Sequence, residues 1–245
     1  MNYIIFGATT QISIELICLI KREDKNAFFF LSSRNLNRLK KIPIKCDLKK
    51  GCYKIYNFDL TNDDSRYLDS LTDEIKIHLK KENLIYFFPS IPNLIEGKLN
   101  TQKLDKILNL NFKSPIKIFN SIIKNLNNTK NITYTSSASC IRAKSKNYVY
   151  ASSKLGVERY LSSLTHYFGY KKPFVQIFRL GFINNKKLDS TFNFFFTASP
   201  KSIAEYIFLM NKKNTSNFFY FPRIVYLLKY LIILIPRFIY KKIKY

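Results

Sequence analysis

The stretch that decides the fold is YIIFGATTQIS, residues 3–13. It begins with four residues that are either aromatic or β-branched, which is typical of a strand buried on both faces. Small residues around Gly7 then predict a turn, and the apolar spacing after Gln11 predicts a helix. Amides at the N-terminus of such a helix can hold a phosphate, so this unit is typical of a nucleotide-binding α/β fold.

The rest of the chain repeats this alternation. Short apolar runs predict strands at 3–6, 27–31, 53–57, 84–88, 131–135, 174–179 and 217–220. Amphipathic patterns between them predict helices at 11–22, 65–81, 101–126, 148–168 and 200–211. Strands joined by helical crossovers run parallel, so we expect an α/β, doubly wound (Rossmann) parallel sheet of about seven strands, with the site at the carboxyl ends of the strands.

The composition limits the class of protein. A chain of 245 residues suits one domain, and 41 Lys and Arg against 16 Asp and Glu give a net charge of +25. Nucleic acid is the usual partner of such a charge. However, Lys, Asn, Ile, Phe and Tyr are abundant together, as in proteins encoded by AT-rich genomes, and the bases form no single stripe. Acids end at Glu205 while bases continue to Lys244, which favours a membrane surface over nucleic acid.

The four cysteines show no metal-type spacing, and the sequence holds only two histidines, so no metal site is expected. Cys18 falls on the apolar face of the first predicted helix, where we expect a buried thiol. The N-terminus starts directly on a strand, without the pattern of a signal peptide. The expected location is therefore cytoplasmic, in a reducing compartment at the inner face of the cell membrane.

Tyr150 and Lys154 lie four residues apart in YVYASSK, residues 148–154. On the predicted helix they share one face, which brings the lysine ammonium beside the phenol. A phenol titrates near pH 10, and lowering its pKa toward 7 needs about 4 kcal/mol, which a close cation in a partly buried site can supply. The alternative is a helix with an aromatic face and a solvated lysine, because Tyr and Lys are both common here.

Ser137 and Asn111 complete a pattern with this pair. Ser137 ends the predicted strand in NITYTSSA, residues 131–138, and Asn111 lies on the long predicted helix. With the nucleotide-type start, this combination resembles the short-chain dehydrogenase/reductase family over residues 1–220. The resemblance implies an NAD(P)-binding reductase domain over those residues, followed by a basic, apolar tail at 221–245.

The same resemblance implies roles for the four catalytic residues. Tyr150 would protonate a carbonyl oxygen as general acid, and Ser137 would donate a hydrogen bond to that oxygen. Lys154 would lower the pKa of Tyr150 and bind the nicotinamide ribose. Asn111 would hold a water that links Lys154 to solvent. The reaction implied is the reduction of a ketone to an alcohol, or the reverse.

The cofactor residues that the resemblance implies are Gly7, Thr9, Thr10, Gln11, Ile12, Arg34, Asp59, Leu60, Tyr150, Lys154, Gly181 and Ile183. Arg34 follows the second strand, where an NAD-preferring enzyme has an acid, and it could pair with a 2′-phosphate; this favours NADP(H) over NAD(H). The alternative is that Arg34 is one of many surface bases. Asp59 would contact adenine, or it would only cap a turn.

Two departures from the family pattern keep a second function open. Gln11 and Ser13 stand where the family has its second and third glycine, and FFPS, residues 87–90, replaces the usual Asn-Asn-Ala-Gly. A cofactor-binding protein with impaired catalysis is therefore one alternative, and a basic nucleic-acid-binding protein is another.

The tail combines apolar, aromatic and basic residues between Phe221 and Lys242. Lys229 and Pro236 interrupt its apolar run, so it predicts an amphipathic helix on the membrane surface. Packing on the same chain or on a partner in a homo-oligomer, and a short spanning hairpin, are alternatives. The tail resembles the decaprenylphosphoryl keto-sugar reductase subgroup. The substrate implied is a small-molecule or polyprenyl-linked ketone, on a lipid-linked or cell-surface sugar, which places the protein in polysaccharide biosynthesis.

Overall fold

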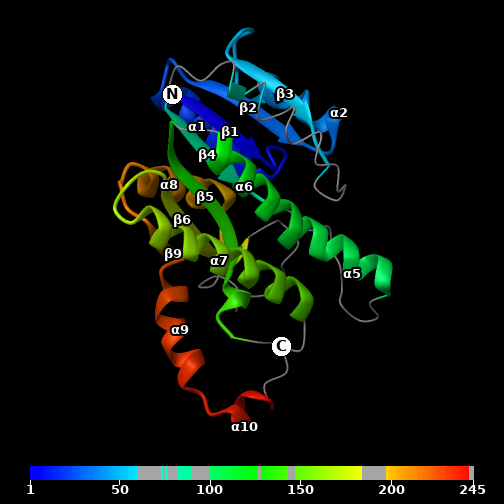
Figure 1. Cartoon of the computed structure of the whole chain (residues 1–245), viewed down its shortest axis with the longest axis vertical. Helices are drawn as coiled ribbons and strands as arrows, with labels where there is room; N and C mark the ends of the chain where they lie inside the picture. The colour runs from blue at the N-terminus through cyan, green and yellow to red at the C-terminus, as the bar shows by residue number, and fades with distance from the viewer. Residues whose placement is uncertain are drawn as a thin grey trace.

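The computed structural model describes residues 1–59, 73, 75–76, 82–89, 100–125, 128–142, 147–183 and 197–242. Within these residues the chain forms a seven-stranded parallel sheet in the order β3-β2-β1-β4-β5-β6-β9 (Figure 1). The strands are β1 (Asn2–Phe6), β2 (Phe28–Ser33), β3 (Tyr53–Asn57), β4 (Asn83–Phe87), β5 (Thr129–Ser137), β6 (Phe174–Leu180) and β9 (Asn217–Phe221). The doubly wound parallel sheet expected from the sequence is confirmed.

The strand order reverses between β1 and β4, which are neighbours in the sheet. Connections on either side of this point leave in opposite directions, so the carboxyl ends of β1 and β4 open a crevice where ligands bind in sheets of this kind. The carboxyl ends of β2, β5 and β6 lie along the same edge because all the strands are parallel.

Helices cover both faces of the sheet. Alternate side chains of β1 enter two separate cores, with Tyr3 and Ile5 in one and Ile4 and Phe6 in the other. The first core is closed by α1 (Gln11–Glu23) and α8 (Pro200–Asn211), and the second by α6 (Ser114–Asn125) and α7 (Tyr148–Phe168). Because β1 is buried on both faces, its sequence is apolar from Tyr3 to Phe6 rather than alternating.

Helix bounds agree with expectation to within one residue at α1, α7 and α8. The helix expected at 101–126 is divided into α5 (Thr101–Leu108), the π-helical turn η1 (Asn109–Lys113) and α6. Short elements of two to four residues were not predicted, because they carry no readable periodicity; they include α2 (Leu36–Leu39), α3 (Ile42–Lys45), β7 (Phe182–Ile183) and β8 (Thr197–Ala198). The helix expected at 65–81 falls almost wholly outside the described residues.

A disulfide joins Cys18 on α1 to Cys46, the residue that caps the C-terminus of α3. The expectation that Cys18 is a free thiol is therefore wrong. The two cysteines are 28 positions apart in the chain, and they meet because α3 and α1 pack in the same core. Cys52 and Cys140 are free.

The tail begins at the end of β9 and forms α9 (Ile224–Leu234) and α10 (Arg237–Tyr240), separated at Pro236 (Figure 1). None of the helices in the described ranges is long and apolar enough to cross a membrane. Val225 is buried against the body, and the ring of Tyr226 packs on Tyr220 of β9 with 5.3 Å between centroids. The tail thus contacts its own chain, while most of the outer side of α9 is exposed.

Candidate active site

Ser137, Tyr150 and Lys154 come from two neighbouring elements at the carboxyl edge of the sheet. Ser137 is the last residue of β5, and its hydroxyl caps the 3-10 turn η2 (Ala138–Cys140) by accepting from the Ser139 amide at 3.2 Å. Helix α7 begins at Tyr148, which places Tyr150 in its first turn and Lys154 one turn further along the same face. Ser137 hydrogen-bonds to Tyr150, as expected of a pair that would share one carbonyl oxygen.

Lys154 is buried, with 2% of its surface exposed. Its Nζ donates a hydrogen bond to the carbonyl of Thr135 at 2.8 Å and lies 5.6 Å from the centroid of the Tyr150 ring. Burial lowers the pKa of Lys154 to about 7, against the opposing influence of Cys140 and Glu158. A solvated lysine, the alternative considered from the sequence, is thereby excluded.

The pKa of Tyr150 lies above its ordinary value rather than below it. Burial is the main cause and Cys140 adds to it, while the hydrogen bond with Ser137 acts in the opposite direction. The expectation that Lys154 lowers the pKa of Tyr150 is therefore wrong for the protein without a bound cofactor. The reason is that burial removes charge from both partners: it disfavours the phenolate, and it weakens the ammonium that would have stabilised the phenolate.

Asn111 occupies the π-helical turn η1 and is fully buried. Its Nδ2 donates to the carbonyl of Ile107 at 3.0 Å, whereas its Oδ1 has no hydrogen-bond partner among the described residues. A π-turn inside a long helix is often found at a functional site. An unpaired buried acceptor costs free energy, and a bound water would satisfy it.

Gly156 explains how η1 approaches α7. A Cβ at this position would lie 2.6 Å from the ring of Phe112, so only glycine lets the two segments pack this closely. Gly156 was not among the residues predicted from the sequence, although a glycine inside a helix is the usual signal of close packing.

Glu158 lies one turn after Lys154 and is also buried. Its carboxylate accepts from Arg179 on β6, at 2.6 Å from Nη2 and at 3.0 and 3.2 Å from Nε. Arg179 donates in turn to the hydroxyl of Tyr220 at 3.1 Å. This pair was also missed from the sequence, since the two residues are 21 positions apart and meet only through the packing of α7 on β6.

The turn after β1 is closed by side-chain hydroxyls. Gly7 has a left-handed φ of 79°, and a Cβ there would lie 2.2 Å from the Phe88 carbonyl oxygen. Thr10 caps α1 by accepting from the Ser13 amide at 3.2 Å, and the Ser13 hydroxyl donates to the Gly7 carbonyl at 2.9 Å. Ser13 stands where the family has a glycine, and its buried side chain stabilises the turn through this hydrogen bond.

The predicted phosphate-side residues follow the same edge. Thr9 and Thr10 are half-buried, Gln11 is exposed at the first position of α1 and Ile12 is buried. Gln11 therefore needs no space inside the turn. At the start of α1 the Ser13 amide is bonded to Thr10, whereas the amides of Gln11 and Ile12 have no carbonyl one turn before them and can bind an anion.

Arg34 is exposed immediately after β2, and a second exposed base follows on the short helix α2. Arg38 donates from Nη2 to the Thr9 carbonyl at 3.3 Å, and the hydroxyls of Ser33 and Thr9 are 2.8 Å apart. Ser33 and Arg38 were not predicted. The signal was Asn35, which caps α2 and so places Arg38 in the first turn of that helix.

Of the remaining predicted cofactor residues, the structure describes Asp59, Gly181 and Ile183. Asp59 is half-buried after β3, and Leu60 lies outside the described residues. The Gly181 amide donates to the Phe221 carbonyl at 2.8 Å, and Ile183 pairs with Ala198 in the small sheet β7-β8. The structure thus brings together the ends of β1, β2, β5 and β6 with the residues predicted on them.

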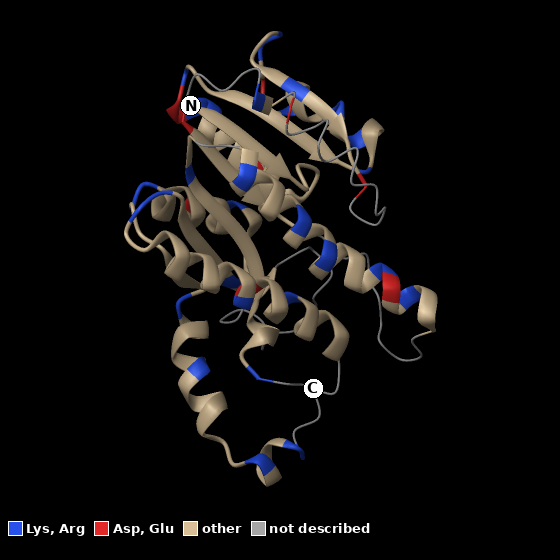
Figure 2. Ribbon diagram, viewed as in Figure 1, with Lys and Arg blue, Asp and Glu red and all other residues tan. Residues whose placement is uncertain are grey.

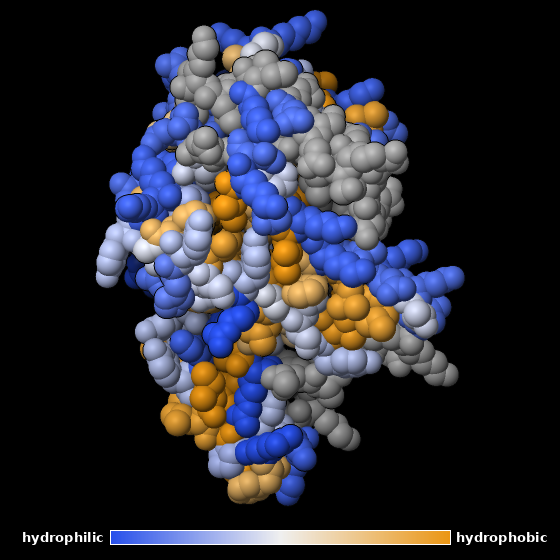
Figure 3. All heavy atoms as spheres, viewed as in Figure 1, coloured by the Kyte–Doolittle hydropathy of each residue, from blue (hydrophilic) through white to orange (hydrophobic). Residues whose placement is uncertain are grey.

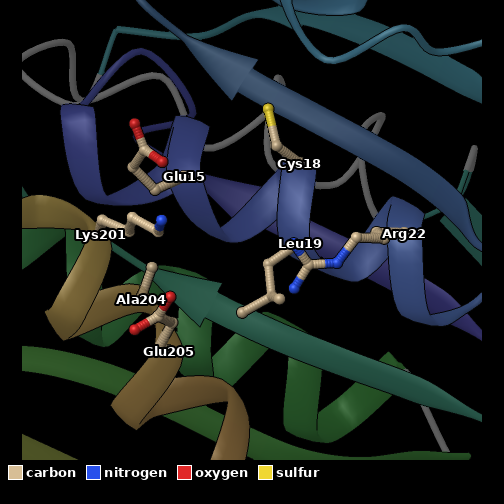
Figure 4. Close-up of a pocket in the computed structure, with 7 residues that line it drawn as sticks. All are labelled: Glu15, Cys18, Leu19, Arg22, Lys201, Ala204 and Glu205. Atoms are coloured by element: carbon tan, nitrogen blue, oxygen red, sulfur yellow. The ribbon is translucent and has the colours of Figure 1, made fainter.

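A hollow of about 100 Å³ lies between α1 and α8 (Figure 4). Its lining residues are Glu15, Cys18, Leu19, Arg22, Lys201, Ala204 and Glu205. It is on the face of the sheet opposite α7 and contains none of the predicted site residues. Geometry at the carboxyl edge, rather than this hollow, therefore identifies the site.

Comparison with known proteins identifies the family of the chain. A family model described as short chain dehydrogenase matches residues 3–192. No match to a curated protein was found.

Solved structures share the fold at low identity. A short-chain dehydrogenase/reductase from Serratia marcescens is 14% identical, with a TM-score of 0.74 over 89% of this chain and 96% of its own. A metagenomic short-chain oxidoreductase in complex with NADP is 13% identical, with a TM-score of 0.71 over 90% and 96%. A variant of the actinorhodin polyketide ketoreductase with NADPH is 13% identical, with a TM-score of 0.75 over 90% and 95%. The matched residues include the turn after β1, Ser137, Tyr150 and Lys154, and the chain belongs to the short-chain dehydrogenase family of oxidoreductases.

Proposed function

We propose that the protein is an NADPH-dependent reductase that converts a ketone to an alcohol on a lipid-linked or cell-surface sugar at an anionic membrane surface. The observation that carries the catalytic part is the arrangement of Ser137, Tyr150 and Lys154 at the end of β5 and the start of α7. The tail, described below, supports the membrane part.

The raised pKa of Tyr150 suits a proton donor. At neutral pH the phenol keeps its proton, which can pass to the carbonyl oxygen as that oxygen becomes an alkoxide. Ser137 stabilises the same oxygen through a hydrogen bond. Lys154, with a pKa of about 7, can gain and lose a proton near neutral pH and so return one toward Tyr150. The unpaired Oδ1 of Asn111 supports a water at the inner end of this path.

A nicotinamide cofactor would supply the hydride for this reduction. The residues fit it in three respects: a helix N-terminus follows Gly7, hydroxyls line the turn, and Arg34 follows β2 while Arg38 of α2 contacts the turn at Thr9. Arg34 and Arg38 support NADP(H) over NAD(H), because a 2′-phosphate needs positive partners where an NAD site carries an acid. NADP and NADPH are bound by two of the solved structures named above.

The exposed side of α9 supports the membrane surface. Leu227, Leu231 and Leu234 recur at helical spacing and are 60%, 61% and 76% exposed. Figure 3 shows apolar side chains gathered at the end of the molecule where α9 lies. The bases around this apolar side are Arg223, Lys229, Arg237, Lys241 and Lys242, and Figure 2 shows no acid on α9 or α10.

This combination favours an anionic bilayer as the partner. Apolar residues enter the interface, and each nearby base adds about 1 kcal/mol of attraction to anionic lipid. A substrate carried on a lipid would be presented at that surface, beside the carboxyl edge of the sheet. The proposal includes the location expected from the sequence, at the inner face of the cell membrane.

The first experiment is a fluorescence titration of purified protein with NADPH and NADH, followed by a panel of ketones. The panel pairs a free keto-sugar with the same sugar on a polyprenyl phosphate in anionic vesicles. We expect tighter binding of NADPH and faster oxidation of it with the lipid-linked ketone. Binding of NADPH without turnover of any ketone would favour the alternative of impaired catalysis, for which Gln11 and the segment 87–90 are the reasons. Failure to bind either cofactor would contradict the proposal.

A further inference from the structure

Arg142 joins the tail to the segment that follows Ser137. Its Nη1 donates to the carbonyl of Ile235 at 2.6 Å and, in a short contact, to the carbonyl of Ile232. Its guanidinium also lies over the ring of Tyr240, 4.0 Å from the centroid. One side chain of the body therefore contacts the end of α9 and the adjoining α10.

The sequence of the tail explains why α9 needs this contact. In a continuing helix the amide of residue 236 would donate to the carbonyl of Ile232, but residue 236 is a proline and has no amide proton. The guanidinium of Arg142 supplies the missing donor. Its positive charge also lies at the C-terminus of the helix, where the helix dipole favours a cation.

The body side of the contact is close to the chemistry. Arg142 is five positions after Ser137 and eight before Tyr150, and the turn η2 that Ser137 caps leads directly to it, with the Ile141 amide bonded to the Ala138 carbonyl at 3.1 Å. We call residues 138–142 the η2 segment. A movement of Arg142 is therefore transmitted to the η2 segment, whose hydrogen bonds orient the Ser137 hydroxyl.

The other end of α9 leads to the same site. Tyr226 packs on Tyr220, whose hydroxyl accepts from Arg179, and Arg179 pairs with Glu158 one turn after Lys154. Figure 1 shows α9 and α10 extending past the end of the sheet where η2 and the start of α7 lie. The tail is thus attached at two points, and both lead to elements that carry predicted catalytic residues.

We propose that Arg142 couples the tail to the η2 segment, so that docking of α9 on an anionic bilayer orders the segment that positions Ser137 against Tyr150. This rests on the proposed function, because it takes the bilayer as the partner of α9. An 11-residue helix is marginal in water by itself, so its population with Arg142 engaged can be increased by any surface that binds the formed helix. Arg142 acts here as a positioning residue. The coupling is reciprocal: loosening the η2 segment weakens the tail, and loosening the tail weakens the η2 segment.

The test uses hydrogen exchange of the full chain, read at 138–142 and at 224–235. In the first arm, without vesicles, Arg142→Ala should speed exchange several-fold in both segments. Arg142→Lys keeps the charge beside the carbonyls and should restore part of the protection. Arg159→Ala removes an exposed base of α7 and serves as the matched control, with exchange as in the parent.

In the second arm, vesicles of phosphatidylcholine with phosphatidylglycerol are added. The parent should gain protection in both segments, whereas Arg142→Ala should gain it only at 224–235. With a ketone found active in the panel above, vesicles should raise kcat of the parent several-fold and leave kcat of Arg142→Ala unchanged, with similar KM for a water-soluble ketone.

The outcomes separate the two proposals. Unchanged exchange at 138–142 in Arg142→Ala, in the first arm, would overturn the coupling even if the protein binds membranes. If vesicles change neither the exchange nor the kcat of the parent, the membrane part of the proposed function is overturned. The regulation proposed here is then overturned as well, whatever the first arm gives. If Arg142→Ala does not fold, Tyr240→Leu loosens the contact from the tail side, and unaltered exchange at 138–142 in that variant would contradict the coupling.

Discussion

At the residue scale, burial decides the chemistry of Tyr150 and Lys154. The same low-dielectric surroundings hold the proton on the phenol and remove it from the ammonium. The pKa of Tyr150 therefore rises and that of Lys154 falls, which reverses their ordinary order. A donor that stays protonated next to an amine that titrates near neutrality is suited to giving one proton and being resupplied. In the proposed mechanism Tyr150 therefore donates the proton and Lys154 resupplies it, and no phenolate is held by a cation.

Tyr150→Phe tests the donor. The phenyl ring keeps the packing and loses only the proton, so ketone reduction should fall at least about 100-fold while NADPH binding survives. Steady-state turnover and cofactor fluorescence measure the two quantities. Tyr160→Phe, the same change on the same helix, is the control. Activity of Tyr150→Phe within a few-fold of the parent would remove Tyr150 from the role of acid.

Lys154 gives the stability of the protein a specific pH dependence. Its pKa in the folded state is about 7, below its ordinary 10.5, so between these values the unfolded chain binds more protons than the folded one. Stability contributed by this residue therefore rises with pH across that window. We expect the free energy of unfolding of the parent, minus that of Lys154→Met, to increase from pH 7 to pH 9 in urea titrations. Equal slopes for both proteins would show that Lys154 is charged in the folded state.

Arg34 and Arg38 are expected to read the cofactor phosphate. Arg34→Ala and Arg38→Ala should each weaken NADPH binding by about 10-fold to 100-fold and NADH binding much less, because the lost partner is the 2′-phosphate. Arg159→Ala, which removes an exposed base elsewhere, should change neither affinity. Equal losses for NADPH and NADH would mean that neither arginine contacts that phosphate.

At the scale of elements, the π-helical turn η1 depends on a glycine of another helix. Gly156→Ala would press a methyl group into the ring of Phe112, so either the ring or η1 must move. We expect a loss of about 1–3 kcal/mol in the free energy of unfolding, as for other overpacked contacts. Phe112→Ala should relieve most of this loss in the double variant, and Ser152→Ala at an exposed position of α7 should cost little. A loss that persists in the double variant would place the strain elsewhere.

The elements that sequence analysis predicted well are those with a strong period. Helices α7 and α8 begin and end where their apolar spacing does, and the central strands differ from expectation by one or two residues. The π-turn at Asn111 could not be predicted, because one extra residue per turn hardly changes a helical pattern. The disulfide of Cys18, the Glu158–Arg179 pair and the Arg142 contact all join distant positions, and no local pattern reports such pairing.

In the candidate site, too, the features with a local sequence pattern were predictable and those that depend on tertiary packing were not. The proximity of Ser137, Tyr150 and Lys154 was predictable because one strand end and one helix fix their spacing. The direction of the Tyr150 pKa was not, since it depends on how deeply the surrounding chain buries the ring. Arg38 belongs to the same class, because its approach to Thr9 depends on a four-residue helix.

At the scale of the whole molecule, the charge of +25 is distributed widely, but α9 and α10 combine bases with exposed apolar residues (Figure 2). A nucleic acid would need the bases alone, whereas the exposed leucines gain nothing from a phosphate backbone. Salt dependence separates the contributions, because only the electrostatic part of membrane binding is screened. Binding that vanishes entirely at high salt would favour a nucleic acid or a purely electrostatic contact.

The structure also determines where a truncation can be made. The Phe221 carbonyl accepts from the Gly181 amide at the end of β6, so removal of residues 221–245 would disturb the sheet itself. A chain that ends after Pro222 keeps this hydrogen bond and removes α9 and α10. Circular dichroism should confirm that it folds, although the loss of buried Val225 will lower its stability.

The last prediction is that the exposed leucines of α9 hold the protein on anionic vesicles. Leu231→Ser with Leu234→Ser removes two side chains that the body does not bury, so the fold should survive while burial in the bilayer interface is lost. At about 1.5–3 kcal/mol for each leucine that becomes buried, vesicle binding should weaken at least about 100-fold. Leu209→Ser on α8, at a position 55% exposed, is the matched control and should bind as the parent does. Sedimentation with phosphatidylglycerol vesicles measures all three proteins, and the chain that ends after Pro222 should stay in solution. If the double variant pelleted like the parent while the truncated chain did not, the bases of the tail alone would be the anchor.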